Sequence, residues 1–215
     1  MILPAPLIHY RGLVSYEAGL SAMRDLTRQR TPDTPDQIWL LTHPEILTLG
    51  INGDPAHIHA HNTLPVVRCD RGGQVTWHGP GQLVVYPLLD MRRRRLGIRT
   101  LVTALESAVI QLLRHYGILG AARPEAPGVY VGDQKIASVG LRISRGCSYH
   151  GMSLNVNPDF QGFSMINPCG QPGLQPTSLE RLGVGVTVEE IMPGLAAELL
   201  ESLNVAAAPI ATPDS

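Results

Sequence analysis

Cys169 is the residue of this chain with the clearest potential for nucleophilic chemistry. It lies in the segment Asn167-Pro168-Cys169-Gly170, where the flanking proline and glycine predict a rigid loop that leaves the thiol accessible. Cysteine attacks as its thiolate, which a neighbouring base or cation helps to form near neutral pH. From the residues alone, Lys135 and His78 are both candidates for that neighbour.

Lys135 is distinctive because it is the single lysine among 17 basic residues, the others being arginine. A bias in genomic base composition explains the abundance of arginine but not this exception. Arginine keeps its proton in proteins, whereas a lysine side chain can take up and release one. We therefore treat Lys135 as a candidate acid–base residue, with chance retention of one lysine as the alternative.

A glycine-rich segment at residues 71–82, RGGQVTWHGPGQ, contains four glycines and one proline. It separates two apolar runs and predicts a shaped loop at a sheet end, where backbone N–H groups can approach a ligand. The segment is neither a Walker A loop nor a dinucleotide-binding G-x-G-x-x-G turn. A tight connection without a ligand is the alternative, but the polar side chains favour binding: Arg71, Thr76, His78 and Gln82.

Two other polar groups have simpler interpretations. His57, His59 and His61 alternate, but Asp54-Pro55-Ala56 and Asn62 around them predict a loop and no fourth ligand follows, so we expect no metal site. The run Arg92–Arg95 is typical of a solvated face, and docking of an acidic protein partner is its functional alternative.

The elements that position these residues follow from periodicity and caps. Helices are predicted at residues 15–29, 100–116 and from the capping box Thr187-x-x-Glu190 to Leu203. Strands are predicted at 38–42, 46–49, 66–70, 83–89, 128–131, 135–143 and 154–156, with a hairpin around Gly132-Asp133. This order predicts an α/β chain of the α+β type, in which a mixed β-sheet has flanking helices.

Composition limits the function classes. The 215 residues are 44% hydrophobic with a net charge of −1, which suits one catalytic domain over 1–215 with a core at about 8–204 and a fraying tail at 205–215. Near-neutral charge argues against nucleic-acid binding, and no apolar run is long enough for a membrane span. Residues 1–7 do not resemble a secretory signal. Three scattered cysteines favour a reducing cytoplasm; we interpret Cys69 as buried and Cys147 as incidental.

Four ordered segments resemble the signatures of the bacterial octanoyltransferases of lipoate biosynthesis: residues 71–82 continuing to 90, 132–140, 150–157 and 167–170. The similarity spans about 38–182. This family moves an octanoyl group from acyl carrier protein to a lysine of lipoyl domains, in 2-oxoacid dehydrogenase complexes and the glycine cleavage system. The resemblance implies a fold like the catalytic domain of lipoate- and biotin-protein ligases.

The resemblance also implies roles for individual residues. Cys169 would accept the acyl group and Lys135 would be its activating partner, without a metal or another cofactor. Trp77 stands where the family pattern has tyrosine, and we expect it to form an aromatic wall of the acyl site. The residues implied to bind substrate are Arg71, Gly72, Gly73, Gln74, Val75, Thr76, Trp77, His78, Ser138, Val139, Gly140, Gly151, Met152 and Ser153.

The implied reaction agrees with the motifs. Transfer between two thiols is nearly isoenergetic and transfer onward to an amine is downhill, so no ATP-binding loop is required. The partners would be octanoyl-acyl carrier protein and lipoyl domains, and we expect a cytoplasmic monomer. Three alternatives stay open: an ATP-dependent lipoate or biotin ligase, a thioesterase or other hydrolase using Cys169 and His78, and a non-catalytic acyl-binding protein.

Overall fold

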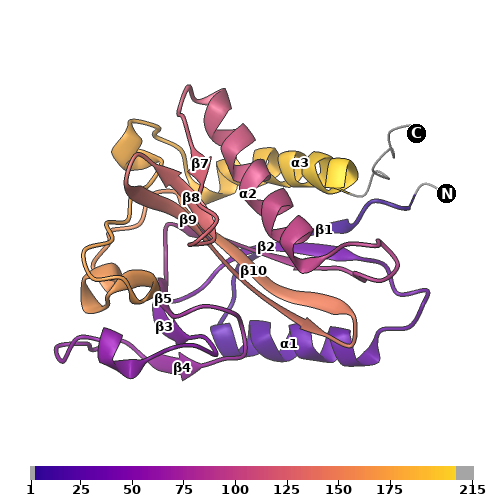
Figure 1. The fold of residues 1–215 in the computed structure, drawn as a ribbon, viewed down its shortest axis with the longest axis horizontal. Coiled ribbons are helices and arrows are strands. Elements are labelled where there is room, and N and C mark those ends of the chain that lie inside the picture. Colours follow the sequence, from indigo (N-terminus) through magenta and orange to yellow (C-terminus); the bar gives the residue numbers. More distant parts are fainter. Residues whose placement is uncertain (1–2, 207–215) are drawn as a thin grey trace, which may run out of the picture.

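The computed structural model describes residues 3–206 (Figure 1). Its main sheet has the strand order β1-β2-β6-β10-β9-β8-β7. Strand β1 (Leu7–Leu13) is parallel to β2 (Gln37–Thr42), and every other neighbouring pair in this sheet is antiparallel. The remaining strands are β6 (Gln82–Leu88), β7 (Ala121–Ala122), β8 (Gly128–Val131), β9 (Gln134–Ser144) and β10 (Cys147–Asn155). The predicted mixed sheet is confirmed.

A smaller sheet lies beside the first, with the order β4-β3-β5. It contains β3 (Ile46–Leu49), β4 (Val66–Arg68) and β5 (Val75–His78). Strand β5 pairs antiparallel with β3 and lies inside the glycine-rich segment. The prediction that residues 71–82 form only a loop is therefore wrong, because glycines bracket a short buried strand rather than replacing it.

Helices cover both faces of the main sheet. Helix α1 (Tyr16–Gln29) lies on one face, and α2 (Ile98–His115) and α3 (Val188–Ala206) pack against each other on the opposite face (Figure 1). The predicted caps are confirmed: Ala18 N–H donates to Ser15 Oγ, and Thr187 and Glu190 exchange hydrogen bonds of 2.8 and 3.2 Å. Helix α3 extends to Ala206, so the predicted fraying tail begins too early, and its residues 207–215 lie outside the described part.

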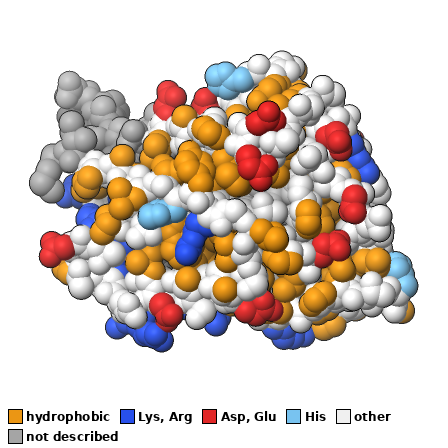
Figure 2. Space-filling model, turned by 180° about the vertical axis from the view of Figure 1, so that it is seen from behind, with side chains coloured by type: hydrophobic (Ala, Val, Ile, Leu, Met, Phe, Trp, Pro, Cys, Tyr) orange, Lys and Arg blue, Asp and Glu red, His pale blue; other side chains and the backbone are white. Residues whose placement is uncertain are grey.

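The hairpin between β8 and β9 is confirmed, but three strands depart from the predictions. Strand β10 is much longer than the predicted 154–156, because burial on both faces removes the alternation that marks a half-exposed strand. The short β7 gave no signal. Strand β1 was not predicted, since this sheet edge leaves Leu7, Tyr10 and Leu13 exposed. Figure 2 shows hydrophobic side chains at the surface on the face behind Figure 1.

The arginine run is not a simple solvated face. Asp36 is buried and accepts hydrogen bonds from Arg30, Arg93 and Arg94 at 2.7, 2.8 and 2.6 Å. Burial opposes ionisation, but the Asp90 N–H, Arg94 and Arg93 hold the pKa of Asp36 below its usual value. Half of the run therefore joins the chain before β2 to the chain after β6, and the expectation of a fully solvated run is wrong.

Within residues 3–206, no helix has both the length and the apolar character needed to cross a membrane.

Asp36→Asn is expected to destabilise the fold by about 3–5 kcal/mol, because it leaves buried arginines without a counter-charge. Asp25→Asn removes the exposed partner of Arg28 and is expected to cost less than about 1 kcal/mol. Urea unfolding at neutral pH measures both. Since the folded-state pKa of Asp36 is lowered, its stabilisation is present above its unfolded-state pKa and is lost as the pH falls. Equal midpoints for the two variants would contradict this role.

Candidate active site

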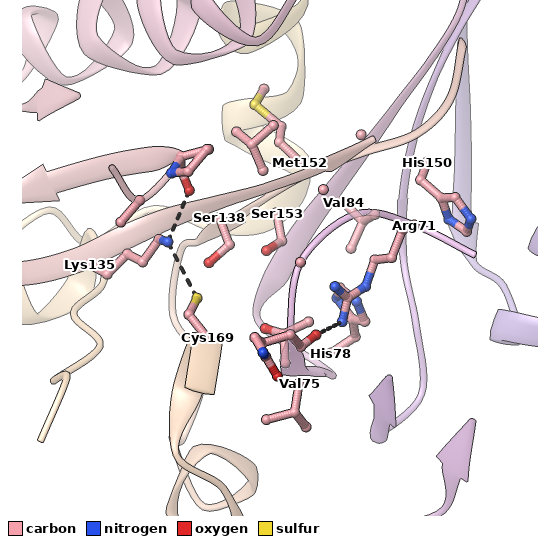
Figure 3. Close-up of a pocket in the computed structure, with 18 of the residues that line it drawn as sticks. Arg71, Val75, His78, Val84, Lys135, Ser138, His150, Met152, Ser153 and Cys169 are labelled. Carbon is pink, nitrogen blue, oxygen red and sulfur yellow. Dashed lines mark hydrogen bonds between the residues drawn. The ribbon is translucent and has the colours of Figure 1, made fainter. Parts of the chain in front are cut away.

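A cavity of about 220 Å³ lies where the two sheets meet. Strands β5, β6, β9 and β10 supply most of its wall, and Tyr16 of α1 and the turns at 71–74, 125–127 and 169–171 complete it. Figure 3 shows Lys135 and Cys169 on one side and Arg71, His78 and His150 on the other. Ser138 and Ser153 lie between them as a cross-strand pair.

Lys135 and Cys169 are in direct contact. Lys135 Nζ donates to Cys169 Sγ at 3.3 Å and to the Pro127 carbonyl oxygen at 3.0 Å. The lysine is 5% exposed, whereas Cys169 is half-buried. Of the two activating groups that the sequence left open, the structure places Lys135 beside the sulfur.

Backbone pairing brings these residues together. Lys135 N–H donates to the Gln175 carbonyl at 2.9 Å, and Thr177 N–H donates to the Lys135 carbonyl at 3.0 Å. The segment that follows the Cys169 turn therefore pairs with the residue that bears the ammonium group. On the other side of the turn, Asn167 N–H donates to the His57 carbonyl at 2.9 Å. The thiol is consequently held from both directions.

The Cys169 turn itself has an unusual backbone. Pro168–Gly170 forms a single 3₁₀ turn, and Cys169 has a φ of +57°. A left-handed conformation is costly for a residue with a Cβ and persists only where the surrounding structure enforces it. The hydrogen bonds on both sides of the turn supply that constraint and direct the Cys169 side chain toward Lys135.

Gly128 provides the space for the lysine. Its φ is +139°, and a Cβ at this position would collide with the Ala137 carbonyl oxygen and would lie 2.6 Å from Lys135 Cε and 3.2 Å from Lys135 Nζ. The Lys135 side chain therefore passes over a backbone without a side chain, next to the Pro127 carbonyl that it binds. Only glycine leaves this approach open.

A chain of buried amides connects the far side of the cavity to the segment that pairs with Lys135. Gln82 Nε2 donates to Asn155 Oδ1 at 3.0 Å, so Gln82 Oε1 accepts from His78 Nδ1 at 2.7 Å. Asn155 Nδ2 then donates to the Thr177 carbonyl at 2.9 Å. Burial lowers the pKa of His78 well below its usual value, so its ring is neutral at pH 7. This arrangement leaves His78 Nε2 without a proton.

His150 and Asp70 form a second polar pair near the cavity. His150 Nε2 bonds Asp70 Oδ1 at 2.9 Å, and the hydroxyl of Tyr149 donates to the other oxygen. Burial lowers the pKa of His150 to about 4 despite this carboxylate. Burial of Asp70 works against its ionisation, but the His150 and Tyr149 hydrogen bonds hold its pKa well below the usual value. The pair is therefore a neutral imidazole held by a carboxylate.

Arg71 mainly holds the backbone around the site in place. Its guanidinium donates to the backbone carbonyls of Thr48, Gly72 and Gln74 at 2.7, 2.9 and 2.8 Å. A buried arginine that bonds three carbonyls fixes the path of the turn between β4 and β5. The residue still lines the cavity, as predicted.

Most of the residues predicted to bind substrate line this cavity, but Gly72 and Trp77 do not. Trp77 is 1% exposed and packs against Phe163, with ring centroids 5.2 Å apart. Trp77 belongs to β5 of the second sheet, but its side chain does not line the cavity. The expectation of an aromatic cavity wall at Trp77 is therefore wrong. Gly72 donates its N–H to the Leu141 carbonyl and packs against β9.

Several residues of the cavity wall were not predicted from the sequence. These are Tyr16, Val84, Tyr86, Glu125, Ala126, Pro127, His150 and Gln171. Tyr86 and His150 fall inside the quoted segments and carry a signal that was not used. Tyr16 gave no such signal, because it reads as an apolar position of α1.

The histidine triplet lies beside the Cys169 turn. His57 ends a 3₁₀ turn (Pro55–His57), and the His59 ring bonds the Ser164 carbonyl and Asn167 Oδ1 at 2.9 and 3.3 Å. The predicted loop is confirmed. Across the described residues, no three His, Cys, Asp or Glu side chains are grouped so that they could hold a metal ion.

Comparison with known proteins agrees with this geometry. A crystal structure of lipoate-protein ligase A bound with ATP aligns with a TM-score of 0.76 at 15% identity, over 93% of this chain and 86% of that one. Biotin protein ligase from Aquifex aeolicus aligns with a TM-score of 0.57 at 13% identity, over 92% and 70%. The fold is thus that of the lipoyl protein ligase A/B catalytic domain, whose family model matches residues 15–200.

Sequence relatives narrow this class. The octanoyltransferase of Methylococcus capsulatus is 54% identical over 198 residues, which are 92% of this chain and 96% of that protein. The octanoyltransferase of Alkalilimnicola ehrlichii is 53% identical over 204 residues, 93% and 95% of the two chains. The chain belongs to the octanoyltransferase family.

Gly128→Ala is expected to slow iodoacetamide alkylation of Cys169 by about tenfold, because the new Cβ collides with the Ala137 carbonyl and the Lys135 side chain and so displaces Lys135 from the thiol. Gly132→Ala is the matched control, since Gly132 also has a positive φ but nothing lies within 4 Å of its Cβ position. Both variants lose some stability, which thermal unfolding measures. Equal alkylation rates in the two folded variants would show that the Gly128 approach does not position Lys135.

Proposed function

We propose that this octanoyltransferase moves the octanoyl group from acyl carrier protein to a lysine ε-amine of a lipoyl domain through an acyl-Cys169 thioester. The observation that carries this mechanism is the contact of Lys135 Nζ with Cys169 Sγ at 3.3 Å. It occurs on the wall of a cavity large enough for a short acyl chain. We further infer a cytoplasmic monomer, and its three free cysteines support the reducing compartment.

In the first half-reaction, the Cys169 thiolate attacks the thioester carbonyl of the acyl carrier. The lysine ammonium favours the thiolate before the attack. As the tetrahedral intermediate collapses, the bond to the carrier sulfur breaks and Lys135 gives its proton to that sulfur. The products are the acyl-Cys169 thioester, a free carrier thiol and a neutral Lys135 amine.

In the second half-reaction, the neutral ε-amine of the acceptor lysine attacks acyl-Cys169. Lys135 takes the proton that this nitrogen loses, and Cys169 departs as a thiolate. An amide has formed, and the thiolate–ammonium pair is restored. Because Lys135 first loses and then regains one proton, the two half-reactions need no other acid or base once the acceptor lysine has lost its first proton to solvent.

The cavity suits an aliphatic chain. Val84, Val139 and Met152 supply apolar surface between the strands. Burial of a seven-carbon tail contributes on the order of 5 kcal/mol at roughly 0.8 kcal/mol per CH₂, before ordering costs. We assign acyl binding to the lining residues of the predicted set: Arg71, Gly73, Gln74, Val75, Thr76, His78, Ser138, Val139, Gly140, Gly151, Met152 and Ser153.

The hydrolase alternative has less support. It requires His78 to activate Cys169, but His78 uses Nδ1 for Gln82, and the hydrogen bond to the sulfur comes from Lys135. The ligase alternative gains only a shared fold from the likeness to lipoate-protein ligase A, because the identity is 15%. A lysine in contact with a half-buried cysteine favours acyl transfer through the thiol.

Intact mass spectrometry after mixing with octanoyl-acyl carrier protein tests the covalent step. The wild-type chain is expected to gain one octanoyl group, which a lipoyl domain then removes. Cys169→Ser is expected to give no thioester adduct. Cys69→Ser is the matched control and keeps the adduct, because a hydroxyl can replace the buried thiol that donates to Leu49. A wild-type enzyme that turns over without any adduct would contradict the mechanism.

Lys135→Arg separates charge from proton transfer. The guanidinium keeps a positive charge near Cys169 but cannot release its proton, so we expect residual alkylation of Cys169 and a loss of turnover of about 10²–10³-fold. Steady-state transfer to a lipoyl domain measures the turnover, and thermal unfolding checks the fold. Wild-type turnover in this variant would exclude Lys135 as the proton carrier.

A further inference from the structure

Glu106 is a buried carboxylate of α2 that the proposed mechanism does not use. It is 8% exposed and lies on the helix face that packs toward the main sheet. Its Oε1 accepts the N–H of Gly128 at 2.8 Å. Burial of a carboxylate destabilises the fold unless hydrogen bonds compensate for the lost water. The position of Glu106 against one backbone amide therefore indicates a specific role.

That amide belongs to the peptide that holds the lysine. The carbonyl of Pro127 and the N–H of Gly128 are the two ends of one planar peptide group. Lys135 Nζ donates to the carbonyl oxygen at 3.0 Å, and Glu106 accepts from the N–H on the other side. Any rotation of this peptide would move the carbonyl away from the Lys135 ammonium and break the Glu106 hydrogen bond together.

The local backbone geometry does not by itself fix the orientation of the Pro127–Gly128 peptide. Gly128 has a φ of +139°, and the pairing of β8 with β9 shifts register between Val129 and Tyr130. A glycine beside a register shift can adopt other orientations at little cost, so the strand pairing alone does not fix the Pro127 carbonyl. The hydrogen bond from Glu106 supplies the missing constraint.

Electrostatics agrees with this placement. Burial raises the pKa of Glu106, whereas the Gly128 N–H and the charge of Lys135 oppose that rise. Both charged side chains lie against Gly128, the carboxylate at its N–H and the lysine at the position of the absent Cβ. Glu106 and Lys135 therefore contact the same glycine.

We propose that Glu106 is a positioning residue for the transfer reaction, which orients the Pro127–Gly128 peptide and thereby holds the Lys135 ammonium at Cys169. This role rests on the proposed function, since it acts on the lysine to which that function assigns proton transfer. Glu106 does not touch the reacting atoms, and its effect reaches them only through the peptide and Lys135.

Two conservative variants separate this role from its alternatives. Glu106→Gln keeps an acceptor of the same length and loses the charge, so kcat is expected to stay within about threefold of wild type. Glu106→Asp keeps the charge but is one methylene too short to reach the Gly128 N–H. We expect this variant to lose about tenfold or more in kcat, with KM for octanoyl-acyl carrier protein unchanged. Glu201→Asp, on the exposed face of α3, controls for aspartate inside a helix.

Alkylation of Cys169 by iodoacetamide, without either substrate, gives a second readout in the same proteins. The rate is expected to fall in Glu106→Asp and to be retained in Glu106→Gln, and thermal unfolding checks that both variants are folded at the assay temperature. Wild-type kcat and alkylation in both variants would overturn the proposal. A larger loss in Glu106→Gln than in Glu106→Asp would also overturn it, because charge rather than orientation would then matter.

The exchange rate of the Gly128 amide hydrogen in the wild-type chain tests the Glu106 hydrogen bond without any substitution. The proposal predicts slow exchange, and exchange at the rate of an open loop would overturn it even if a variant failed to fold. These substrate-free measurements also distinguish the two claims. If no octanoyl adduct formed on Cys169, the proposed function would fail, while the alkylation and exchange results would still decide the role of Glu106.

Discussion

Two backbone hydrogen bonds join Lys135 to the segment that follows the Cys169 turn, and the rest of the site depends on them. Lys135 pairs through its own N–H and carbonyl with Gln175 and Thr177, so the segment that returns from the Cys169 turn is bonded to the start of β9. Side-chain contact between an ammonium and a thiol contributes little to folding. The backbone pairing is what makes their 3.3 Å separation a stable property of the fold.

Around this contact, the protein keeps charges few and specifically bonded. Lys135 is almost fully buried, and its hydrogen-bond acceptors are the Pro127 carbonyl and the Cys169 sulfur. On the far side of the cavity, burial keeps His78 and His150 neutral. The Arg71 guanidinium donates hydrogen bonds to backbone carbonyls. In the proposed reaction, the cavity accepts an aliphatic chain while the mobile proton stays at the Lys135 end.

Features with a local physical cause were predictable from the sequence. The caps at Ser15 and Thr187 and the hairpin at Gly132 depend on neighbours within a few residues, and the structure has all three. The family resemblance directed attention to most of the cavity wall. Trp77, Arg94 and β10 were different, because their environment is set by distant segments. Strand alternation places the Trp77 side chain against Phe163. Arg94 is buried because it bonds Asp36, which lies 58 positions earlier in the sequence.

The central claim is that the contact between Lys135 and Cys169 performs the acyl transfer, and the single-turnover rate at which octanoyl-Cys169 forms tests it most directly. Wild type and Lys135→Met would each be mixed with octanoyl-acyl carrier protein near neutral pH and followed by intact mass spectrometry, with Cys169→Ser as the blank. Methionine keeps the apolar stem of the side chain without its ammonium group. Wild type is expected to form the adduct, and Lys135→Met to form it about 10²-fold more slowly or not at all. Equal rates in the two folded proteins would contradict the claim.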